Sequence, residues 1–287
     1  MKIGISSYCL HPSLQSGEWD IQRTIEWIKE QGASHVEIVP IGIPLEDNPQ
    51  LASTIRAAAE SVGLGIANYA VSGDVTSVNP NDYQAEIARL KRQVDLAAEL
   101  GASLMRHDIV PWGYKSKQPG QFEKDFNRFV EACGVISEYA HQYGITTMIE
   151  NHGNYVVASD RVIRLVQEVN RPNFRMLLDI GNFLCVDEDP IAAVNYSLPY
   201  AALIHFKDFY IRKPYEFPGE EWLKTLNGKY IRGAIFGHGD LEIRYLLGQI
   251  KQSAFEGPIS IEFEGLESDQ LGTRLSFANA VRLWEEA

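Results

Sequence analysis

Short apolar runs alternate with amphipathic segments along most of this chain. Apolar runs of this length are typical of buried strands, and residues spaced three and four apart on one side are typical of helices. Several of the helical segments end at a glycine, which adopts the left-handed conformation without a Cβ penalty. These glycines are Gly32, Gly63, Gly101 and Gly144. The alternation predicts βα units and a parallel sheet.

Eight such strands are predicted along the sequence. Their ranges are 3–7, 35–39, 65–70, 103–106, 145–150, 175–179, 201–205 and 258–263. Because eight βα units in 287 residues match one large α/β barrel, we expect a single (β/α)8 TIM barrel over residues 1–287. A doubly wound sheet is the alternative, but it would more naturally carry a GxGxxG turn, and the sequence has none.

One segment breaks the regular spacing of these units. Residues 209–239 are rich in Tyr, Phe, Pro, Gly and Lys, and they lie between the seventh and eighth predicted strands. Long connections of this kind are usually functional. The segment is therefore expected to be an enlarged loop after strand seven, at the mouth of the active site.

Four of the apolar runs end in a polar residue. These residues are Glu150, Asp179, His205 and Glu262. A charged group at the end of a buried strand has lost much of its water and needs a partner. Any one of them alone is more often a loop or capping residue, but strand ends of a barrel converge on one mouth. Three carboxylates and one imidazole without a thiolate suit Mn²⁺, Mg²⁺ or Co²⁺, with Zn²⁺ as a further option.

Charge and cysteine content narrow the class of protein. The formal net charge is −12, which argues against a surface for duplex nucleic acid because such surfaces neutralise phosphates with Lys and Arg. The three cysteines form no CxxC pair, so a disulfide framework or thiolate zinc site is not indicated. The N-terminus lacks the apolar core of a signal peptide, and no run approaches a membrane span. These features predict a cytoplasmic protein without membrane association.

Five motifs carry a resemblance to a known family. They are IENHG (149–153), LDIGNF (178–183), HFKD (205–208), GHGDLE (237–242) and GPISIEFEG (257–265). In these motifs the sequence resembles the sugar phosphate isomerase/epimerase superfamily, with its xylose isomerase-like TIM barrel, over essentially the whole chain. The resemblance implies that Glu150, Asp179, His205 and Glu262 bind a divalent metal ion, Mn²⁺ first, and that the substrate is a small carbohydrate.

The resemblance also implies a reaction. In such an isomerase or epimerase the metal ion stabilises the enediolate that forms when a proton next to a carbonyl of a sugar or keto-sugar is removed. Glu150 and Glu262 are then the acid/base pair, while Asp179 and His205 chiefly hold the metal. The same enediolate could expel a β-leaving group. A dehydratase or lyase acting on an inosose or keto-glycoside is therefore the alternative.

Two positions depart from the ketose 3-epimerase branch of that superfamily. Asn182 stands where a His commonly follows the metal-binding Asp by three residues, and Ala158 stands where a substrate-contacting Glu is expected. An amide can hydrogen-bond a substrate hydroxyl but does not carry a proton at neutral pH. These differences point away from the ketose 3-epimerases and leave the broader metal-dependent function in place.

Further residues are expected to contact the substrate because they lie near the same strand ends or mouth loops. They are His152, Asn182, Lys207, Arg106, Glu37 and His238. No cluster of Arg and Lys marks a phosphate pocket, and Arg212 with Lys213 beyond strand seven is weak support for one. The sequence therefore leaves open whether the substrate is phosphorylated.

Two less favoured functions share the predicted fold. An endonuclease-IV-like DNA repair enzyme needs a three-metal cluster, but the chain has only seven His, and Asn182 replaces one expected ligand. A non-catalytic sugar-binding subunit has no need for paired carboxylates on a metal. Because barrel enzymes often pair through outer helices, a homo-oligomer is compatible with either function.

Overall fold

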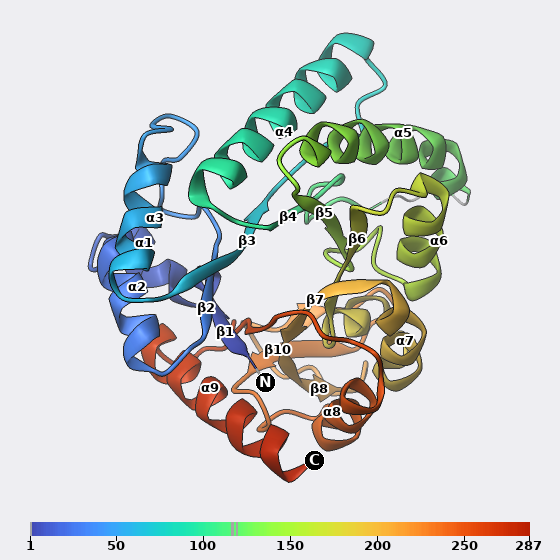
Figure 1. Ribbon diagram of the computed structural model, residues 1–287. Coiled ribbons are helices and arrows are strands. Elements are labelled where there is room, and N and C mark those ends of the chain that lie inside the picture. Colours follow the sequence, from blue (N-terminus) through green and yellow to red (C-terminus); the bar gives the residue numbers. More distant parts are fainter. Residues whose placement is uncertain (1, 116–117, 119) are drawn as a thin grey trace.

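A closed barrel of eight parallel strands forms the centre of the molecule, as predicted (Figure 1). The computed structural model describes residues 2–115, 118 and 120–287. Around the barrel the strand order is β1-β11-β7-β6-β5-β4-β3-β2. The strands are β1 (Ile3–Ser6), β2 (His35–Ile38), β3 (Gly65–Val71), β4 (Leu104–His107), β5 (Thr146–Glu150), β6 (Phe174–Asp179), β7 (Ala201–Phe206) and β11 (Ile259–Ile261).

Helices surround the barrel and connect its strands. They are α1 (His11–Ser16), α2 (Ile21–Glu30), α3 (Leu51–Ser61), α4 (Pro80–Leu100), α5 (Gln121–His141), α6 (Ser159–Val169), α7 (Pro190–Ser197), α8 (Ile243–Gln252) and α9 (Asp269–Glu286). Short 3-10 turns occupy η1 (Ser7–Leu10), η2 (Asn182–Val186) and η3 (Leu198–Tyr200). Within the described ranges, every helix is too short or too polar to cross a bilayer.

Local sequence signals set the ends of these helices. The side chain of Asp20 accepts a hydrogen bond from the backbone N–H of Arg23 and so caps the start of α2. Thr24, Ile25 and Ile28 then face the core, as their spacing predicts. Gly101 ends α4 with a φ of 75°, the left-handed value expected for it.

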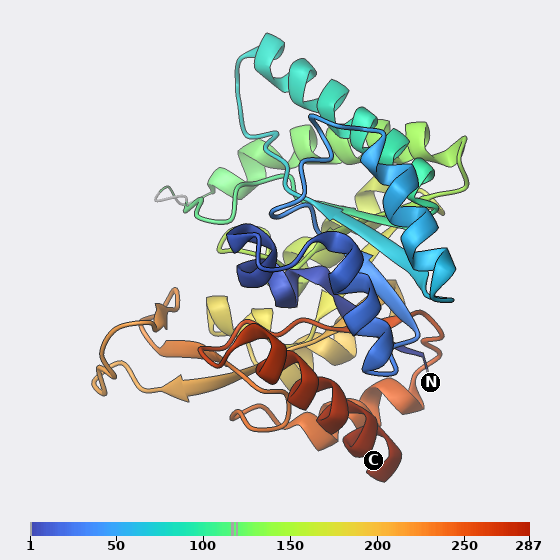
Figure 2. The same ribbon diagram turned by 90° about the vertical axis from the view of Figure 1, so that its left-hand side faces the viewer.

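The segment after β7 is more ordered than the predicted enlarged loop. It forms a three-stranded antiparallel sheet from β8 (Asp208–Arg212), β10 (Tyr230–Ala234) and β9 (Leu223–Lys224). We call residues 208–234 the arm. Figure 2 shows the arm in light orange, projecting on the side of the barrel away from the N-terminus.

Asp208 holds both ends of this excursion together. Its carboxylate accepts hydrogen bonds from four backbone N–H groups, at the start of β8 and in the turn after β10. The donors are Phe209, Gly237, Gly239 and Leu241, at 2.8–3.3 Å. The chain therefore leaves and re-enters the barrel at one fixed point.

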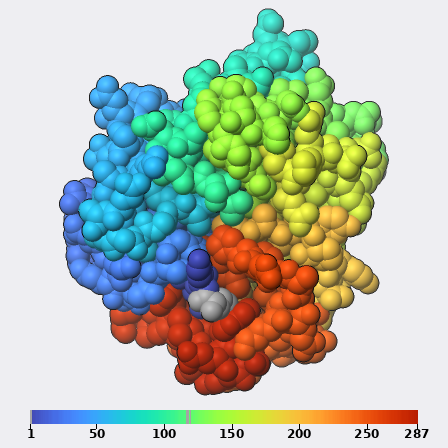
Figure 3. Space-filling model, in the orientation of Figure 1, coloured from blue at the N-terminus to red at the C-terminus, as the bar shows by residue number. Residues whose placement is uncertain are grey.

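The two ends of the barrel differ. In the space-filling view of Figure 3 the start of the chain, in dark blue, lies near the centre of one face. The strands begin at this end, because β1 starts at Ile3. The arm lies on the opposite side, where the strands end. In parallel barrels this second end carries the functional side chains.

Candidate metal centre

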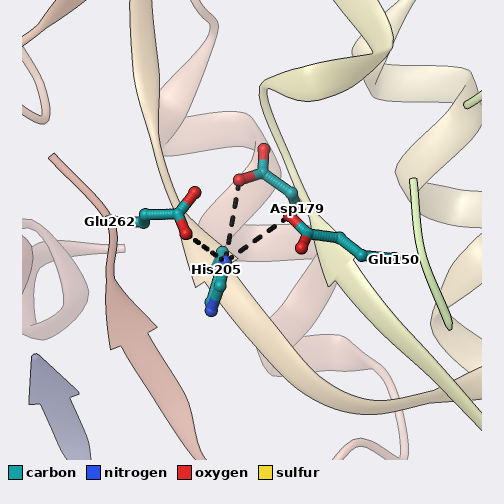
Figure 4. Close-up of side chains that lie close together, drawn as sticks. All are labelled: Glu150, Asp179, His205 and Glu262. Carbon is teal, nitrogen blue, oxygen red and sulfur yellow. Dashed lines mark ion pairs between the residues drawn. The ribbon is translucent and has the colours of Figure 1, made fainter. Parts of the chain in front are cut away.

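Four buried side chains meet where the strands of one half of the barrel end. Glu150 ends β5, Asp179 ends β6, His205 lies near the end of β7, and Glu262 directly follows β11. Their potential ligand atoms all lie within 4.8 Å of one another. Figure 4 shows the three carboxylates directed at the Nδ1 side of the imidazole, at 3.7 Å (Glu150 Oε1), 3.9 Å (Asp179 Oδ2) and 3.4 Å (Glu262 Oε1). The structure thus brings together the four residues predicted as ligands.

Three buried atoms of this cluster make no hydrogen bond: Glu150 Oε2, Asp179 Oδ2 and His205 Nδ1. Glu150 Oε2 forms an ion pair with Arg106 Nε at 2.8 Å, whereas Asp179 Oδ2 lies 3.5 Å from Lys207 Nζ and His205 Nδ1 lies 3.4 Å from Glu262 Oε1. The other side of the Asp179 carboxylate is held, because Oδ1 accepts the backbone N–H groups of Gly181 and Asn182 at 2.8 Å each. Buried polar atoms normally have partners, so Asp179 Oδ2 and His205 Nδ1, which face the same point, indicate a site that can bind a ligand. The donor set of three carboxylates and one imidazole fits a divalent cation.

Glu37 lies behind the His205 ring. Its two carboxylate oxygens are 3.1 and 3.2 Å from Nε2, and Asn68 Nδ2 donates to Oε2 at 2.7 Å. A carboxylate on the far nitrogen of a metal-binding His fixes the ring and leaves the near nitrogen free to coordinate. The structure therefore places Glu37 against a candidate ligand, in a different position from the substrate-facing one predicted.

Arg106 and Lys207 keep the two glutamates ionised. Burial alone would raise the pKa of Glu150, but Arg106, whose Nε lies 2.8 Å from Oε2, lowers the pKa to about 2. Burial opposes ionisation of Glu262 in the same way. Lys207 Nζ, 2.6 Å from its Oε2, and His205 together hold the pKa of Glu262 well below its usual range.

The negative charges in the cluster raise the pKa values of its other two members, Asp179 and His205. Burial, aided by the negative charges of Glu262 and Glu150, raises the pKa of Asp179 to about 6 despite the nearby Lys207. Burial would lower the pKa of His205, yet the carboxylates of Glu37 and Glu262 raise it well above its usual value. The cluster therefore favours an additional positive charge among its carboxylates, which a divalent ion can supply.

A cavity of about 820 Å³ opens beside this cluster. Glu262 lines it, together with four of the residues predicted to contact substrate: Arg106, His152, Asn182 and Lys207. Neither Glu37 nor His238 is among the lining residues, and His238 is exposed in the turn after β10. The volume is within the range of sites for small molecules.

Asn182 connects the two sides of the cluster. Its Nδ2 donates to Glu150 Oε1 at 3.2 Å, and its Oδ1 accepts from Lys207 Nζ at 3.2 Å. The amide thus hydrogen-bonds one negatively charged and one positively charged side chain. A neutral histidine at this position could do the same only in one tautomer.

Asp108 is a site residue that the sequence analysis missed. It directly follows β4, lines the cavity, and lies 3.3 Å from His152 Nδ1 and 3.1 Å from an Arg106 guanidinium nitrogen. The signal was the same as for the four candidate ligands, a carboxylate at a strand end. Glu264, 3.5 Å from Lys207 Nζ, also lines the cavity.

Comparison with protein families gives a match over most of the chain. The family model described as "Xylose isomerase-like TIM barrel" matches residues 25–284. A solved structure described as IOLI protein with a bound zinc atom superposes with a TM-score of 0.78 at 15% identity, covering 100% of this chain and 99% of that one. At this identity the superposition shows a common fold.

Curated relatives match shorter stretches. A 2-epi-5-epi-valiolone 7-phosphate 2-epimerase of Actinoplanes sp. is 32% identical over 168 residues, which cover 57% of this chain and 58% of that protein. An inosose dehydratase of Lactiplantibacillus plantarum is 23% identical over 50% of this chain and 48% of its own length. A ketose 3-epimerase of Arthrobacter globiformis is 28% identical over 70% of both. The chain thus spans about half the length of the first two and more of the third.

Proposed function

The chain belongs to the xylose isomerase-like TIM barrel family of the sugar phosphate isomerase/epimerase superfamily, and we propose that it is a divalent-metal-dependent isomerase or epimerase acting on a sugar or keto-sugar. The observation that carries this proposal is the placement of two ionised glutamates, Glu150 and Glu262, on either side of His205 and Asp179. Two positioned carboxylates are what the removal and return of a proton next to a carbonyl requires.

The metal ion of this proposal is Mn²⁺ first, with Mg²⁺, Co²⁺ or Zn²⁺ as alternatives. Glu150, Asp179, His205 and Glu262 would hold it, since their potential ligand atoms lie within 4.8 Å of one another. When bound, the ion would polarise the substrate carbonyl and so lower the cost of removing the adjacent proton. The solved structure of the same fold that is described with a bound zinc atom supports a metal-binding function for a barrel of this kind.

The protein's own residues have separate tasks in this proposal. Glu262, kept anionic by Lys207, takes the proton from the substrate, and Glu150, kept anionic by Arg106, serves the opposite face. The Lys207 ammonium and the Asn182 amide lie at the cavity wall, where they can bind substrate oxygens. Positioned charges of this kind also stabilise negative charge as it develops on oxygen.

A dehydratase acting on an inosose or keto-glycoside is the second candidate. The observation that favours it is the pair formed by His152 and Asp108, because a His oriented by a carboxylate at the cavity wall can give a proton to a departing hydroxyl. The inosose dehydratase among the relatives supports the same outcome. Dehydration and isomerisation give different products from the same substrate. A product assay that detects both therefore distinguishes the two candidate functions.

Substitution of Glu262 by Gln tests the proposal directly. With saturating Mn²⁺ or Co²⁺ and a panel of keto-sugars and inososes, we expect solvent-deuterium exchange at the substrate carbon to fall by about 100-fold or more. Glu267→Gln, the same change outside the cavity lining, is the matched control. Undiminished exchange in the Glu262 variant would rule out this residue as the base. If the wild-type protein contains no bound metal and gains no activity when Mn²⁺ or Co²⁺ is added, the proposed enzymatic function is refuted.

A further inference from the structure

We infer that this site, taken as the metal-dependent sugar site proposed above, accepts uncharged polyhydroxy ketones and discriminates against their phosphorylated forms. The inference rests on the proposed function and names its substrate class. It begins with the excess of carboxylates over fixed cations in and beside the cavity. The carboxylates are Glu37, Asp108, Glu150, Asp179, Glu262 and Glu264, and the fixed cations are Arg106 and Lys207.

Two of the three guanidinium nitrogens of Arg106 are engaged by protein groups. Its Nε lies 2.8 Å from Glu150 Oε2, and one terminal nitrogen lies 3.1 Å from Asp108 Oδ2 and donates to the Val71 carbonyl at 3.2 Å. The side chain is nearly buried between these partners. A guanidinium held in this way has little capacity left for the bidentate contact that phosphate sites use.

Lys207 is engaged in the same manner. Its Nζ lies 2.6 Å from Glu262, 3.5 Å from Asp179 and 3.5 Å from Glu264. One ammonium group thus faces three carboxylates. The charge of Lys207 is needed to offset its neighbours and is not available as the main counter-charge of a ligand.

Counting the charges shows that added cations do not reverse the balance. A divalent ion beside the two fixed cations supplies four positive charges against six carboxylates. A phosphate monoester adds between one and two negative charges at neutral pH. The site would then hold several uncompensated negative charges in a largely buried space, which is unfavourable.

No further cation lines the cavity among the residues that the structure describes. The remaining charged lining residues are Glu46 and Asp47, at the rim. Arg212, which the sequence offered as a weak phosphate contact, is exposed, lies 3.4 Å from Asp240 and stacks over Trp222. It is not part of the cavity lining.

The same surface suits a neutral polyol. Carboxylates are acceptors, and each sugar hydroxyl is a donor that can use them. Trp112 lies at the cavity and offers an apolar face, while Asn182 offers both donor and acceptor. A cavity of about 820 Å³ has room for a six-carbon ketose or a cyclitol ketone.

Matched substrate pairs test the inference. Metal-loaded enzyme in D₂O is given D-fructose and D-fructose 6-phosphate, D-xylulose and D-xylulose 5-phosphate, and 2-keto-myo-inositol alone, and deuterium incorporation next to the carbonyl is measured. We expect kcat/KM for an unphosphorylated member to exceed that of its phosphorylated partner by at least about 100-fold. Inorganic phosphate added to the unphosphorylated reactions controls for loss of metal to phosphate.

Each result has a distinct meaning. Equal or faster exchange with the phosphorylated members would overturn this inference and leave the proposed function standing. No exchange with any compound would overturn the proposed function and the inference that rests on it.

A charge variant tests the cause of the discrimination. Glu264→Gln removes one negative charge from the cavity wall. We expect it to lower the ratio of kcat/KM between unphosphorylated and phosphorylated substrate by roughly fivefold. Glu267→Gln, outside the lining, should leave the ratio unchanged. An unchanged ratio in the Glu264 variant would show that the charge balance is not the cause.

Discussion

Two buried histidines in the barrel, His35 and His205, have opposite surroundings. His35 Nδ1 lies 3.0 Å from the Ser34 hydroxyl, and its Nε2 lies 3.0 Å from the Ser260 hydroxyl. His205 has the Glu37 carboxylate on one side and three further carboxylates on the other. Burial lowers the pKa of His35, whereas the carboxylates around His205 raise its pKa well above the usual value.

The difference separates a structural polar group from a ligand site. Both nitrogens of His35 are paired with neutral hydroxyls, so this histidine needs nothing more from its surroundings. His205 keeps one nitrogen unpaired, and the charge around it calls for a cation. Burial of a polar residue is therefore a poor guide to function, and the charge and completeness of its partners are a better one.

Asp179→Asn should give the largest effect in this comparison. It removes one anionic ligand but keeps an oxygen for the N–H groups of Gly181 and Asn182. Because losses outside the ligand shell already cost about 10–100-fold in metal affinity, we expect a loss of more than about 100-fold for Mn²⁺ or Zn²⁺. Isothermal titration calorimetry measures it.

The metal-free Asp179→Asn protein should be at least as stable as the wild type, because the change removes a buried carboxylate that lacks a full partner. If the variant instead unfolded at a much lower temperature and kept its metal affinity, the cluster around His205 would be structural and not a ligand site.

Gly4→Ala should disturb the other histidine. A Cβ at this position would lie 2.3 Å from the His35 ring and 2.6 Å from the His35 carbonyl oxygen, so the ring or strand must shift. Overpacking of this kind costs about 1–3 kcal/mol of unfolding free energy. Denaturant unfolding of the metal-free protein measures the loss, and metal affinity should stay within about twofold, well inside the range of a ligand-shell effect. A tenfold loss of affinity would show that the two environments are not separate.

Glu37→Gln should have an intermediate effect on the metal centre. The substitution keeps an acceptor for His205 Nε2, but its amide opposes the donor of Asn68. We expect metal affinity to fall by about 10-fold, the lower end for a residue that orients a ligand. Competition titration with a chelating dye measures the change. Unaltered affinity would mean that Glu37 does not position His205.

The pH dependence of stability should give the smallest effect. Burial lowers the pKa of His35 below its ordinary value of 6.5, although Glu37 opposes and Lys2 reinforces the shift. The unfolded chain then binds more protons than the folded one as pH falls below 6.5, so His35 contributes a loss of stability on acidification. In urea unfolding of metal-free protein, His35→Gln should lose less stability than the wild type between pH 7 and pH 5. A steeper loss in the variant would contradict this.

Most of the barrel could be predicted because burial on both faces makes its strands continuous apolar runs. The arm was predicted as a loop for a physical reason. Its strands have one face on the protein and one outside, where Arg232 stacks over Tyr210 at 5.2 Å. Alternating residues of this kind become strands only once a partner is present.

The candidate site could be predicted less completely. Strand ends gave Glu150 and Asp179 because position along a strand is visible in the sequence. The neighbour that a side chain meets across the barrel is not, so Glu37 was expected to face substrate although it holds His205. Asp108 carries the same signal of a carboxylate after a strand, but its contact with His152, which follows the neighbouring strand, is not visible in the sequence.

The hydrogen bonds that the Asp208 carboxylate accepts have a consequence for how the sequence of the arm can vary. Both ends of the arm are fixed to the Asp208 carboxylate, which directly follows Lys207 in the sequence. A change at the tip of the arm is therefore expected to leave Lys207 in place. Lengthening a loop whose ends are already joined costs little entropy. Insertions and deletions near the tip can therefore reshape the entrance, where Leu223 lines the cavity, without moving the candidate metal centre. The arm is a part of the molecule in which new specificity can evolve while the chemistry is inherited unchanged.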